Sequence, residues 1–267
     1  MKFPILLPNI FNHPFTYESE IDLKIGDFVE VPFGKARIIG VVWDNFEKKN
    51  NKNFKIKKII RKLQIPSLKK KTLEFLNWFS EYNLVPKGMA LKLTLLSGKA
   101  IEKFDSELYK NSNKFEKNSF RLTKEQKKSL NEINISNQKF NVHVLQGTTG
   151  SGKTIVYFEA LKKILQKGYQ VLIMLPEIGL TSQFEKKFEE FFDFKPAIWH
   201  SGITKKNKEI FWSGVLKGEI KVVIGARSSL FLPFKKLGLI IVDEEHDQSY
   251  KQEEGIIYNA RDMAILR

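Results

Sequence analysis

Apolar residues in the first hundred positions fall into short runs that favour β-strands. The runs DFVEVPFG (27–34) and RIIGVVW (37–43) are rich in β-branched and aromatic residues, and Gly34 begins the turn between them. This pattern predicts a β-hairpin. A further strand is expected in FKIKKIIRKL (54–63). At 67–83 the period becomes helical, with one apolar stripe made of Leu73, Leu76, Phe79 and Tyr82.

From residue 120 onward, apolar runs alternate with helical patterns. The runs are VHVLQ (142–146), VLIML (171–175), KVVIG (221–225) and LIIVD (239–243). Such continuous apolar runs are typical of strands buried on both faces of a parallel sheet. The helical patterns lie at 153–167, 179–192 and 204–218, and Gly168 is placed to cap the first of them. This alternation predicts a parallel sheet with crossover helices.

The predicted class is therefore α/β, with a β-rich domain at 1–96 and a parallel-sheet lobe at 120–267. Residues 97–119 are polar, charged and without periodicity, which indicates a linker.

Composition adds a possible partner. The net charge is +15 over 267 residues, which suits a polyanion such as nucleic acid. Lysine supplies all but six of the 45 basic residues, however, and with many Asn, Ile and Phe it also fits the coding bias of an AT-rich genome. Both explanations remain open.

Compartment and metal chemistry follow from what the sequence lacks. It contains no cysteine, which excludes disulfides and thiolate metal sites in this chain and fits a cytoplasmic protein. No apolar run approaches the ~20 residues of a membrane span, so no membrane association is expected. Prolines interrupt the apolar N-terminus, and no signal peptide is predicted.

The segment GTTGSGKT (147–154) has the G-x-x-x-x-G-K-[S/T] spacing of a phosphate-binding loop, between a predicted strand and a predicted helix. Glycines let backbone N–H groups turn toward an anion, and the helix N-terminus adds positive potential. Lys153 is expected to neutralise the ATP phosphates, and the Thr154 hydroxyl to bind Mg²⁺. The expected nucleotide contacts are Gly147, Thr148, Thr149, Gly150, Ser151, Gly152, Lys153 and Thr154.

The run LIIVDEEH carries the second half of this chemistry. It delivers Asp243 to the carboxyl edge of the sheet, where ligands bind in open α/β sheets. Asp243 is expected to hold the Mg²⁺, and Glu244 to activate a water for attack on the γ-phosphate. A P-loop kinase or GTPase is the alternative, but neither a lid nor a guanine-reading N-K-x-D motif is found.

The DEEH segment, with DQSYKQEEGIIYNARDMAILR after it, resembles the primosomal protein N′ (PriA) family of bacterial replication-restart helicases, in superfamily 2. RLTKEQ, LPEIGLTSQF, HSG and GARSSLFLPF match further family motifs in order, and PFTY and VPFGKARIIGVV resemble its domain for DNA 3′ ends. The resemblance implies a RecA-like motor lobe and ATP-dependent 3′ to 5′ unwinding at stalled forks, leading to primosome assembly. It also implies branched and single-stranded DNA, primosome proteins and single-stranded DNA-binding protein as partners.

The resemblance also implies site residues. Gln126 would contact adenine. The residues implied on the DNA side of the lobe are Thr181, Gln183, His200, Ser201, Arg227, Ser228, Tyr250 and Lys251. Most follow predicted strands, where loops can touch DNA phosphates. Tyr250 would offer a stacking face, whereas Tyr258 is expected to pack in the core.

In the N-terminal domain the implied DNA contacts are Phe15, Thr16, Gly34, Lys57 and Lys58. Phe15 would stack on a terminal base, and a core aromatic is the alternative. Thr16 occupies a position where some family members have an acidic residue that contacts the 3′ hydroxyl.

Two departures from the family pattern shape the expected activity. Only 97–119 lie where the family usually carries a winged-helix domain, and the sequence stops at Arg267, before the next motor motif. The second lobe, its arginine finger and the zinc-binding cysteines are thus expected to be missing. This predicts weak nucleotide and fork binding with negligible ATP hydrolysis. The alternative is a fork-binding module that recruits partners without ATPase activity.

Overall fold

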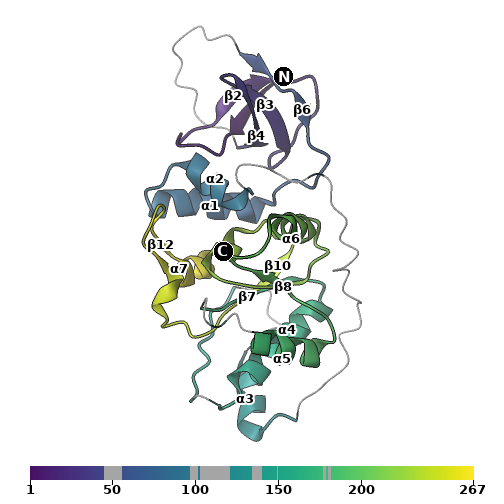
Figure 1. Ribbon diagram of the computed structural model, residues 1–267, viewed down its shortest axis with the longest axis vertical. Helices are drawn as coiled ribbons and strands as arrows, with labels where there is room; N and C mark the ends of the chain where they lie inside the picture. The colour runs from purple at the N-terminus through teal and green to yellow at the C-terminus, as the bar shows by residue number, and fades with distance from the viewer. Residues whose placement is uncertain are drawn as a thin grey trace.

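The computed structural model describes residues 1–44, 56–96, 102, 121–133, 140–148, 150–176, 179 and 182–267. A small β-barrel lies at one end, two helices follow, and a parallel-sheet lobe flanked by helices forms the rest (Figure 1). The predicted α/β class, with a β-rich part before a parallel-sheet lobe, is confirmed. None of the described helices is long and apolar enough to cross a bilayer.

The N-terminal sheet closes on itself. Its strands are β1 (Lys2–Leu6), β2 (Phe15–Glu18), β3 (Phe28–Phe33), β4 (Ala36–Val42), β5 (Lys57–Lys58) and β6 (Arg61–Lys62), in the order β5-β2-β1-β4-β3-β6. β5 and β6 stand at opposite ends of this order, yet only residues 59 and 60 separate them, so the sheet must curl into a barrel. The predicted hairpin is β3–β4, with Gly34 in its turn at φ +60°. The strand expected at 54–63 is two short strands.

Side chains alternate between the barrel interior and its outer surface. Ile5 of β1 and Leu7, directly after it, belong to an interior cluster that includes Val29, Val31 and Val42. Leu6, between them, belongs to a different cluster on the outer surface. The outer surface is therefore also apolar and needs a cover.

Two helices supply part of that cover. α1 (Lys70–Tyr82) confirms the helix expected at 67–83, and α2 (Lys87–Thr94) follows it. Leu73, Leu76 and Phe79 are buried as the stripe predicts. Tyr82 is 64% exposed, so its place in the stripe was wrong. It stands in the last turn, and its ring stacks on Trp78 instead, with centroids 4.6 Å apart.

The lobe contains a parallel sheet in the order β10-β7-β9-β8. Its strands are β7 (Gln170–Met174), β8 (Ala197–Trp199), β9 (Val222–Gly225) and β10 (Leu237–Val242). Its helices are α3 (Lys124–Glu132), α4 (Lys153–Gln166), α5 (Ser182–Phe192), α6 (Lys205–Lys217) and α7 (Ala260–Leu266). Between β9 and α7 lie the 3₁₀ turns η3 (Arg227–Phe231) and η4 (Gln248–Tyr250) and the hairpin β11 (Lys251–Gln252) and β12 (Tyr258–Asn259).

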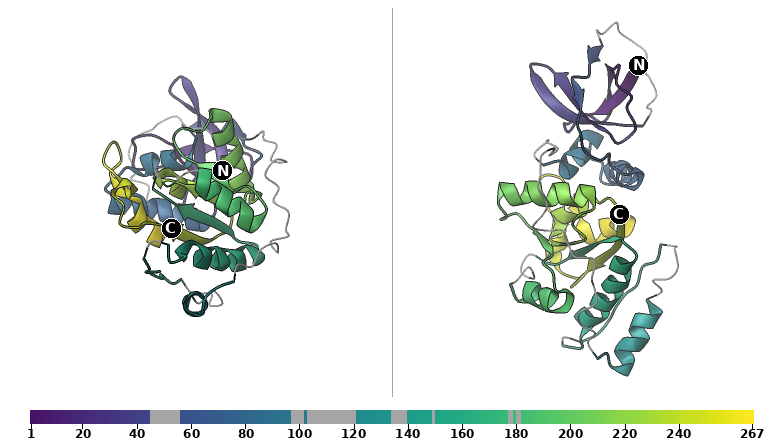
Figure 2. Two further views of the ribbon diagram at one scale, coloured as in Figure 1. Left: turned by 60° about the horizontal axis from the view of Figure 1, so that its bottom comes forward. Right: turned by 90° about the vertical axis from the view of Figure 1, so that its right-hand side faces the viewer.

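Both faces of this sheet are buried. Val171 and Ile173 of β7 pack with α4 and α5, whereas Leu172 and Met174 face the cluster that contains α6 and α7. Figure 2 shows α6 between the sheet and the barrel, with α4 and α5 on the other side. The continuous apolar runs of the sequence reflect this two-sided burial. Gly168 follows α4 at φ +77°, which confirms it as the helix cap.

The strand predicted at 142–146 is not part of the sheet. These residues form neither helix nor strand, and Val144 is 88% exposed. Leu145 alone packs, against Leu130 of α3 and Val156 of α4. The apolar run therefore anchors the segment to two helices instead of pairing with β10. Among the described strands, β10 has a neighbour on one side only.

One hydrophobic core joins the barrel, the two helices and the lobe. Phe28 of the barrel meets Trp212 of α6 edge-on, at a centroid distance of 5.9 Å. The Trp212 indole N–H donates to the carbonyl of Thr94 at 2.7 Å. Phe79 of α1 contacts the ring of Phe231 at 5.0 Å and that of Tyr258 at 5.5 Å. The apolar outer surface of the barrel is thus buried against the lobe.

Arg267 reinforces the same contact. Its guanidinium donates to Thr72 Oγ1 in α1 and to the carbonyls of Leu230 and Leu232, each at 3.2 Å. It also lies 5.2 Å from the centre of the Phe75 ring, a cation–π distance. Burial lowers the pKa of Arg267 to about 10, so the group is still charged at neutral pH.

We predict that Phe79→Ala destabilises barrel and lobe together. The ring is fully buried, and removing a buried Phe side chain costs about 3–5 kcal/mol of unfolding free energy. Urea unfolding followed by circular dichroism and by tryptophan fluorescence should move to lower midpoint in one coincident transition. Tyr82→Ala, an exposed aromatic on the same helix, should cost under about 1.5 kcal/mol. Two separated transitions in the wild type would contradict a shared core.

A second constraint lies inside the barrel region. The buried carboxylate of Asp27 accepts hydrogen bonds from Lys62 Nζ at 2.6 Å, from Ser67 Oγ at 2.5 Å and from the Lys24 N–H at 2.8 Å. Burial on its own would raise the pKa of Asp27, but these bonds outweigh it and hold the pKa below its ordinary value. The charged form is therefore the one that stabilises the fold.

Because the folded pKa of Asp27 is depressed, its contribution is complete above the unfolded pKa of ~3.9 and is lost as pH falls through the folded value. We predict that Asp27→Asn lowers the unfolding free energy at pH 7 by about 1–3 kcal/mol. As pH falls below about 4, the unfolding free energy of the variant should decrease less than that of the wild type. Thermal unfolding at a series of pH values measures this difference. Asp22→Asn, at an exposed position, should leave both quantities unchanged.

Candidate functional site

The phosphate-binding loop has backbone geometry suited to an anion. Gly150 and Gly152 have φ of +82° and +83°, a region that side chains disfavour. A Cβ on Gly147 would lie 2.6 Å from Ser151 Oγ, so a larger residue there would force the Ser151 side chain to move. α4 starts at Lys153 without a side-chain cap, which leaves its first N–H groups for a ligand. Thr149 lies outside the described residues.

Lys153 is turned onto its own loop. Its ammonium donates to the carbonyl oxygen of Gly147 at 2.7 Å and contacts that of Thr148 at 3.4 Å. The side chain thus spans the loop that would hold the phosphates. Binding a triphosphate would exchange these carbonyls for phosphate oxygens, which are stronger acceptors for an ammonium.

Asp243 sits where the sequence predicts, directly after β10. Its backbone N–H donates to Met174 at the end of β7, at 3.0 Å. One carboxylate oxygen, Oδ1, accepts from the Glu244 N–H at 3.0 Å. The other, Oδ2, accepts from the Tyr157 hydroxyl at 2.8 Å.

Tyr157 connects Asp243 to the phosphate-binding loop. It lies on α4, three residues after Thr154, and its hydroxyl donates to Asp243. Burial and the nearby Asp243 charge raise the pKa of Tyr157, which keeps the hydroxyl protonated. The structure therefore ties Asp243 to α4, the helix whose first turn carries Thr154, through a residue that sequence reasoning missed. The available signal was the i, i+3 spacing from Thr154, which puts both on one helix face.

Glu244, the expected activator of water, is exposed and has φ of +47°. A positive φ is uncommon for a residue with a side chain, and such strain concentrates at functional sites. The imidazole of His246 lies 3.8 Å from Glu244 Oε2.

Tyr250 does not face solvent. It is 1% exposed, and its hydroxyl lies 2.9 Å from the Met174 carbonyl and 2.6 Å from that of Asp243. Burial raises the pKa of Tyr250. The expected stacking of this ring on a DNA base is therefore wrong: the hydroxyl needs a buried acceptor, and the backbone at the ends of β7 and β10 supplies it. Tyr258 packs against Phe79 and Phe231, as predicted.

Gln126 contacts the loop from α3. Its Nε2 donates to the Ser151 carbonyl at 3.0 Å, and its Oε1 accepts from the Thr123 N–H at 3.0 Å. With Thr123 it forms a capping box, which the sequence TKEQ could have revealed. Contact between Gln126 and adenine stays a prediction.

The residues expected to contact DNA after β8 and β9 lie close together. The Trp199 indole donates to Ser228 Oγ at 3.1 Å, and the Ala226 N–H donates to the Trp199 carbonyl at 3.2 Å. These bonds place His200 and Ser201 beside Arg227 and Ser228. Arg227 donates to the Lys251 carbonyl at 2.5 Å, which ties η3 to β11. Gln183 is exposed in the first turn of α5, and Thr181 lies outside the described residues.

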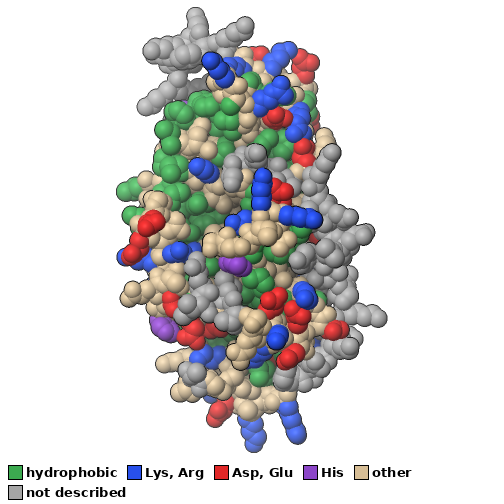
Figure 3. All heavy atoms as spheres, in the orientation of Figure 1, with side chains coloured by type: hydrophobic (Ala, Val, Ile, Leu, Met, Phe, Trp, Pro, Cys, Tyr) green, Lys and Arg blue, Asp and Glu red, His purple; other side chains and the backbone are tan. Residues whose placement is uncertain are grey.

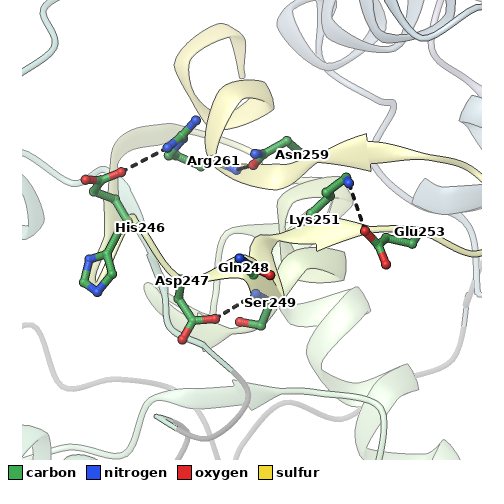
Figure 4. Close-up of a pocket in the computed structure, with 9 residues that line it drawn as sticks. His246, Asp247, Gln248, Ser249, Lys251, Glu253, Asn259 and Arg261 are labelled. Carbon is green, nitrogen blue, oxygen red and sulfur yellow. Dashed lines mark hydrogen bonds and ion pairs between the residues drawn. The ribbon is translucent and has the colours of Figure 1, made fainter.

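An open pocket of about 570 Å³ separates the end of β10 from α7 (Figure 4). Charges of both signs line it, and several pair: Arg261 with Glu245 at 3.1 Å and Lys251 with Glu253 at 2.9 Å. Of its lining residues, sequence reasoning had selected only Lys251. The paired charges leave little net field for a phosphate backbone.

Phe15 stands in an aromatic group on the barrel. Its ring lies 5.2 Å from Phe11, 5.1 Å from His13 and 5.4 Å from Phe33, which precedes the Gly34 turn. Apolar side chains gather along one flank of the barrel in Figure 3. On the rest of the visible barrel surface, basic and acidic side chains are interspersed. Sequence reasoning found Phe15 but missed its three ring neighbours.

Three of the remaining N-terminal candidates lie on β2 or on the strand paired with it. Thr16 follows it on β2, and β2 pairs with β5 so that Lys57 is opposite Tyr17 and Lys58 opposite Glu18. Both lysines are exposed, and Lys58 pairs with Glu20 at 3.1 Å. The barrel therefore brings the predicted aromatic and the two lysines onto neighbouring strands.

Comparison with known proteins decides the family. The model of the DEAD/DEAH box helicase family matches residues 123–265, more than half of the chain. The chain belongs to the DEAD/DEAH box helicase family. Residues 4–95 match the 3′ DNA-binding domain of PriA, which confirms the resemblance seen in the motifs.

Several curated relatives carry the name replication restart protein PriA. That of Rickettsia conorii is 44% identical over 268 residues, covering 98% of this chain and 40% of the relative. That of Bacillus subtilis is 41% identical over 148 residues, covering 55% of this chain and 18% of the relative. That of Haemophilus influenzae is 42% identical over 149 residues, covering 56% and 20%. The chain thus spans about two-fifths of the rickettsial relative.

Proposed function

We propose that this chain supplies an ATP-binding motor lobe and a DNA 3′-end-binding domain to an ATP-dependent helicase of replication restart. One observation carries the proposal: the phosphate-binding loop and Asp243, 90 positions beyond Lys153, meet at one edge of the sheet and are linked through Tyr157. Helicase family membership supports it.

The residues at this edge fit a magnesium-bound nucleotide. Gly150 and Gly152 already adopt the backbone conformation that turns N–H groups toward an anion, and nothing lies within 4 Å of the Cβ position of Gly150. Thr154 and Asp243 offer hydroxyl and carboxylate oxygens, the ligand type that Mg²⁺ prefers. The ion would neutralise charge on the phosphates. Lys153 would bind the phosphate oxygens, and Glu244 would orient water.

DNA contacts are proposed on two surfaces. The aromatic group around Phe15 offers a stacking face for a terminal base, with Thr16, Gly34, Lys57 and Lys58 beside it. On the lobe, the loops after β8 and β9 and the start of α5 would contact phosphates. Unwinding in the 3′ to 5′ direction at stalled forks, and partnership with primosome proteins and single-stranded DNA-binding protein, are part of the same proposal.

A fork-binding module without ATP turnover is the second candidate. The match of residues 4–95 to a 3′ DNA-binding domain supports it, because that part of the chain contains none of the phosphate-binding loop. Phosphate release by the purified chain with forked DNA separates the two. Robust DNA-stimulated release supports a working ATPase, and its absence with intact fork binding supports the module.

Lys153→Ala should weaken ATP binding by about 10-fold to 100-fold, the effect of one lost charge-assisted hydrogen bond. Binding of forked DNA should be unchanged. Fluorescence titration with a labelled ATP analogue and with labelled fork DNA measures both. Lys163→Ala, at an exposed position later on α4, is the matched control and should bind ATP like the wild type. Equal ATP affinity in Lys153→Ala would remove the assignment of the loop.

Phe15→Ala should weaken DNA binding and leave ATP binding unchanged, the opposite of Lys153→Ala. Loss of one stacked base costs about 1–3 kcal/mol, so preference for DNA with a free 3′ hydroxyl over DNA with a blocked 3′ end should fall by about 5-fold or more. ATP affinity should not change. Competition titrations with the two DNAs measure the preference, and circular dichroism checks the barrel. A preference that survives the substitution would rule out Phe15 as the stacking residue.

A further inference from the structure

Tyr157 is buried between the two halves of the candidate nucleotide site. It lies on α4 three residues after Thr154, and its ring packs edge-on against Phe158 at 5.3 Å. Its hydroxyl donates to Asp243 Oδ2 at 2.8 Å. Packing of the ring alone would be satisfied by phenylalanine, so the hydroxyl requires its own explanation.

The hydrogen bonds at Asp243 restrict how the carboxylate can turn. Oδ2 accepts from Tyr157 and Oδ1 from the Glu244 N–H at 3.0 Å. The Tyr250 hydroxyl holds the backbone carbonyl of Asp243 at 2.6 Å. Two donors thus set the plane of the carboxylate, the Tyr157 hydroxyl and the Glu244 N–H. Of these two, Tyr157 lies on α4, the helix that follows the phosphate-binding loop.

We propose that Tyr157 is a positioning residue for magnesium: its hydroxyl holds the Asp243 carboxylate in place relative to α4, the helix whose first turn carries Thr154. The inference rests on the proposed function, since it names a supporting residue for the same site. Hydrogen-bond partners of metal ligands orient them, and losing one typically costs about 10-fold to 100-fold in metal affinity. Tyr157 acts through the ligands and does not itself touch the nucleotide.

The test is magnesium-dependent nucleotide binding by Tyr157→Phe in the full chain. A fluorescent ATP analogue is titrated at fixed concentration with Mg²⁺, and separately bound in excess chelator. The variant should need about 10-fold more Mg²⁺ for half-maximal binding, whereas its affinity for metal-free nucleotide should match the wild type within twofold. Tyr169→Phe is the matched control, because that ring is in the same lobe, under the Lys236 ammonium at 4.1 Å. It should not alter either value.

A double-mutant cycle separates positioning from packing. If Tyr157 acts through Asp243, then adding Tyr157→Phe to Asp243→Asn should cause no further loss of Mg²⁺ dependence. Additive losses, or a Tyr157→Phe variant that binds Mg²⁺ as well as or better than the wild type, would overturn the inference. Thermal unfolding shows whether a variant has lost its fold. If the wild type itself fails to bind nucleotide, the proposed function falls first, which is a different result.

Discussion

Burial of both faces of the β10-β7-β9-β8 sheet is the constraint on which the rest of the structure depends. Each apolar strand of this sheet presents side chains to two sides, and each side needs a cover. α4 and α5 cover one. α6 and α7 cover the other, and they in turn pack on α1 and the outside of the barrel. The attachment of the N-terminal barrel is therefore a product of the same hydrophobic effect that builds the lobe.

Parallel strands also bring their carboxyl ends to one edge, and this explains the placement of the site. Asp243 follows β10, Arg227 follows β9, and His200 follows β8. The polar groups come from distant parts of the chain, yet the common direction of the strands brings them to the same edge. The finer adjustments, such as those made by Tyr157 and Tyr250, are side-chain hydrogen bonds added to that frame.

Much of the lobe could be predicted from sequence because its signals are local. Helix α4 has a strong pattern, a glycine-rich start and Gly168 at its end, and its bounds agree with expectation within a residue. The prediction of a strand at 142–146 was wrong, because an apolar run indicates that a segment is buried but does not identify the elements that bury it. Leu145 packs against α3 and α4. β8 was missed because three residues are too few to form a pattern.

The candidate site was predictable in its chemistry and less so in its contacts. The types and order of Lys153, Thr154 and Asp243 identify phosphate and metal chemistry without a structure. The bonds of Tyr157 join positions 86 residues apart, and no local pattern encodes them. Tyr250 shows the converse, since a polar neighbourhood in sequence concealed a buried ring.

The uncovered side of β10 has a consequence for handling the protein. A strand with unpaired amides and carbonyls along one side is a template on which a strand of another molecule can form. Among the described strands, β10 has a partner only on its β7 side, so its other side is such a template. Self-association through that side of β10 should therefore rise with protein concentration.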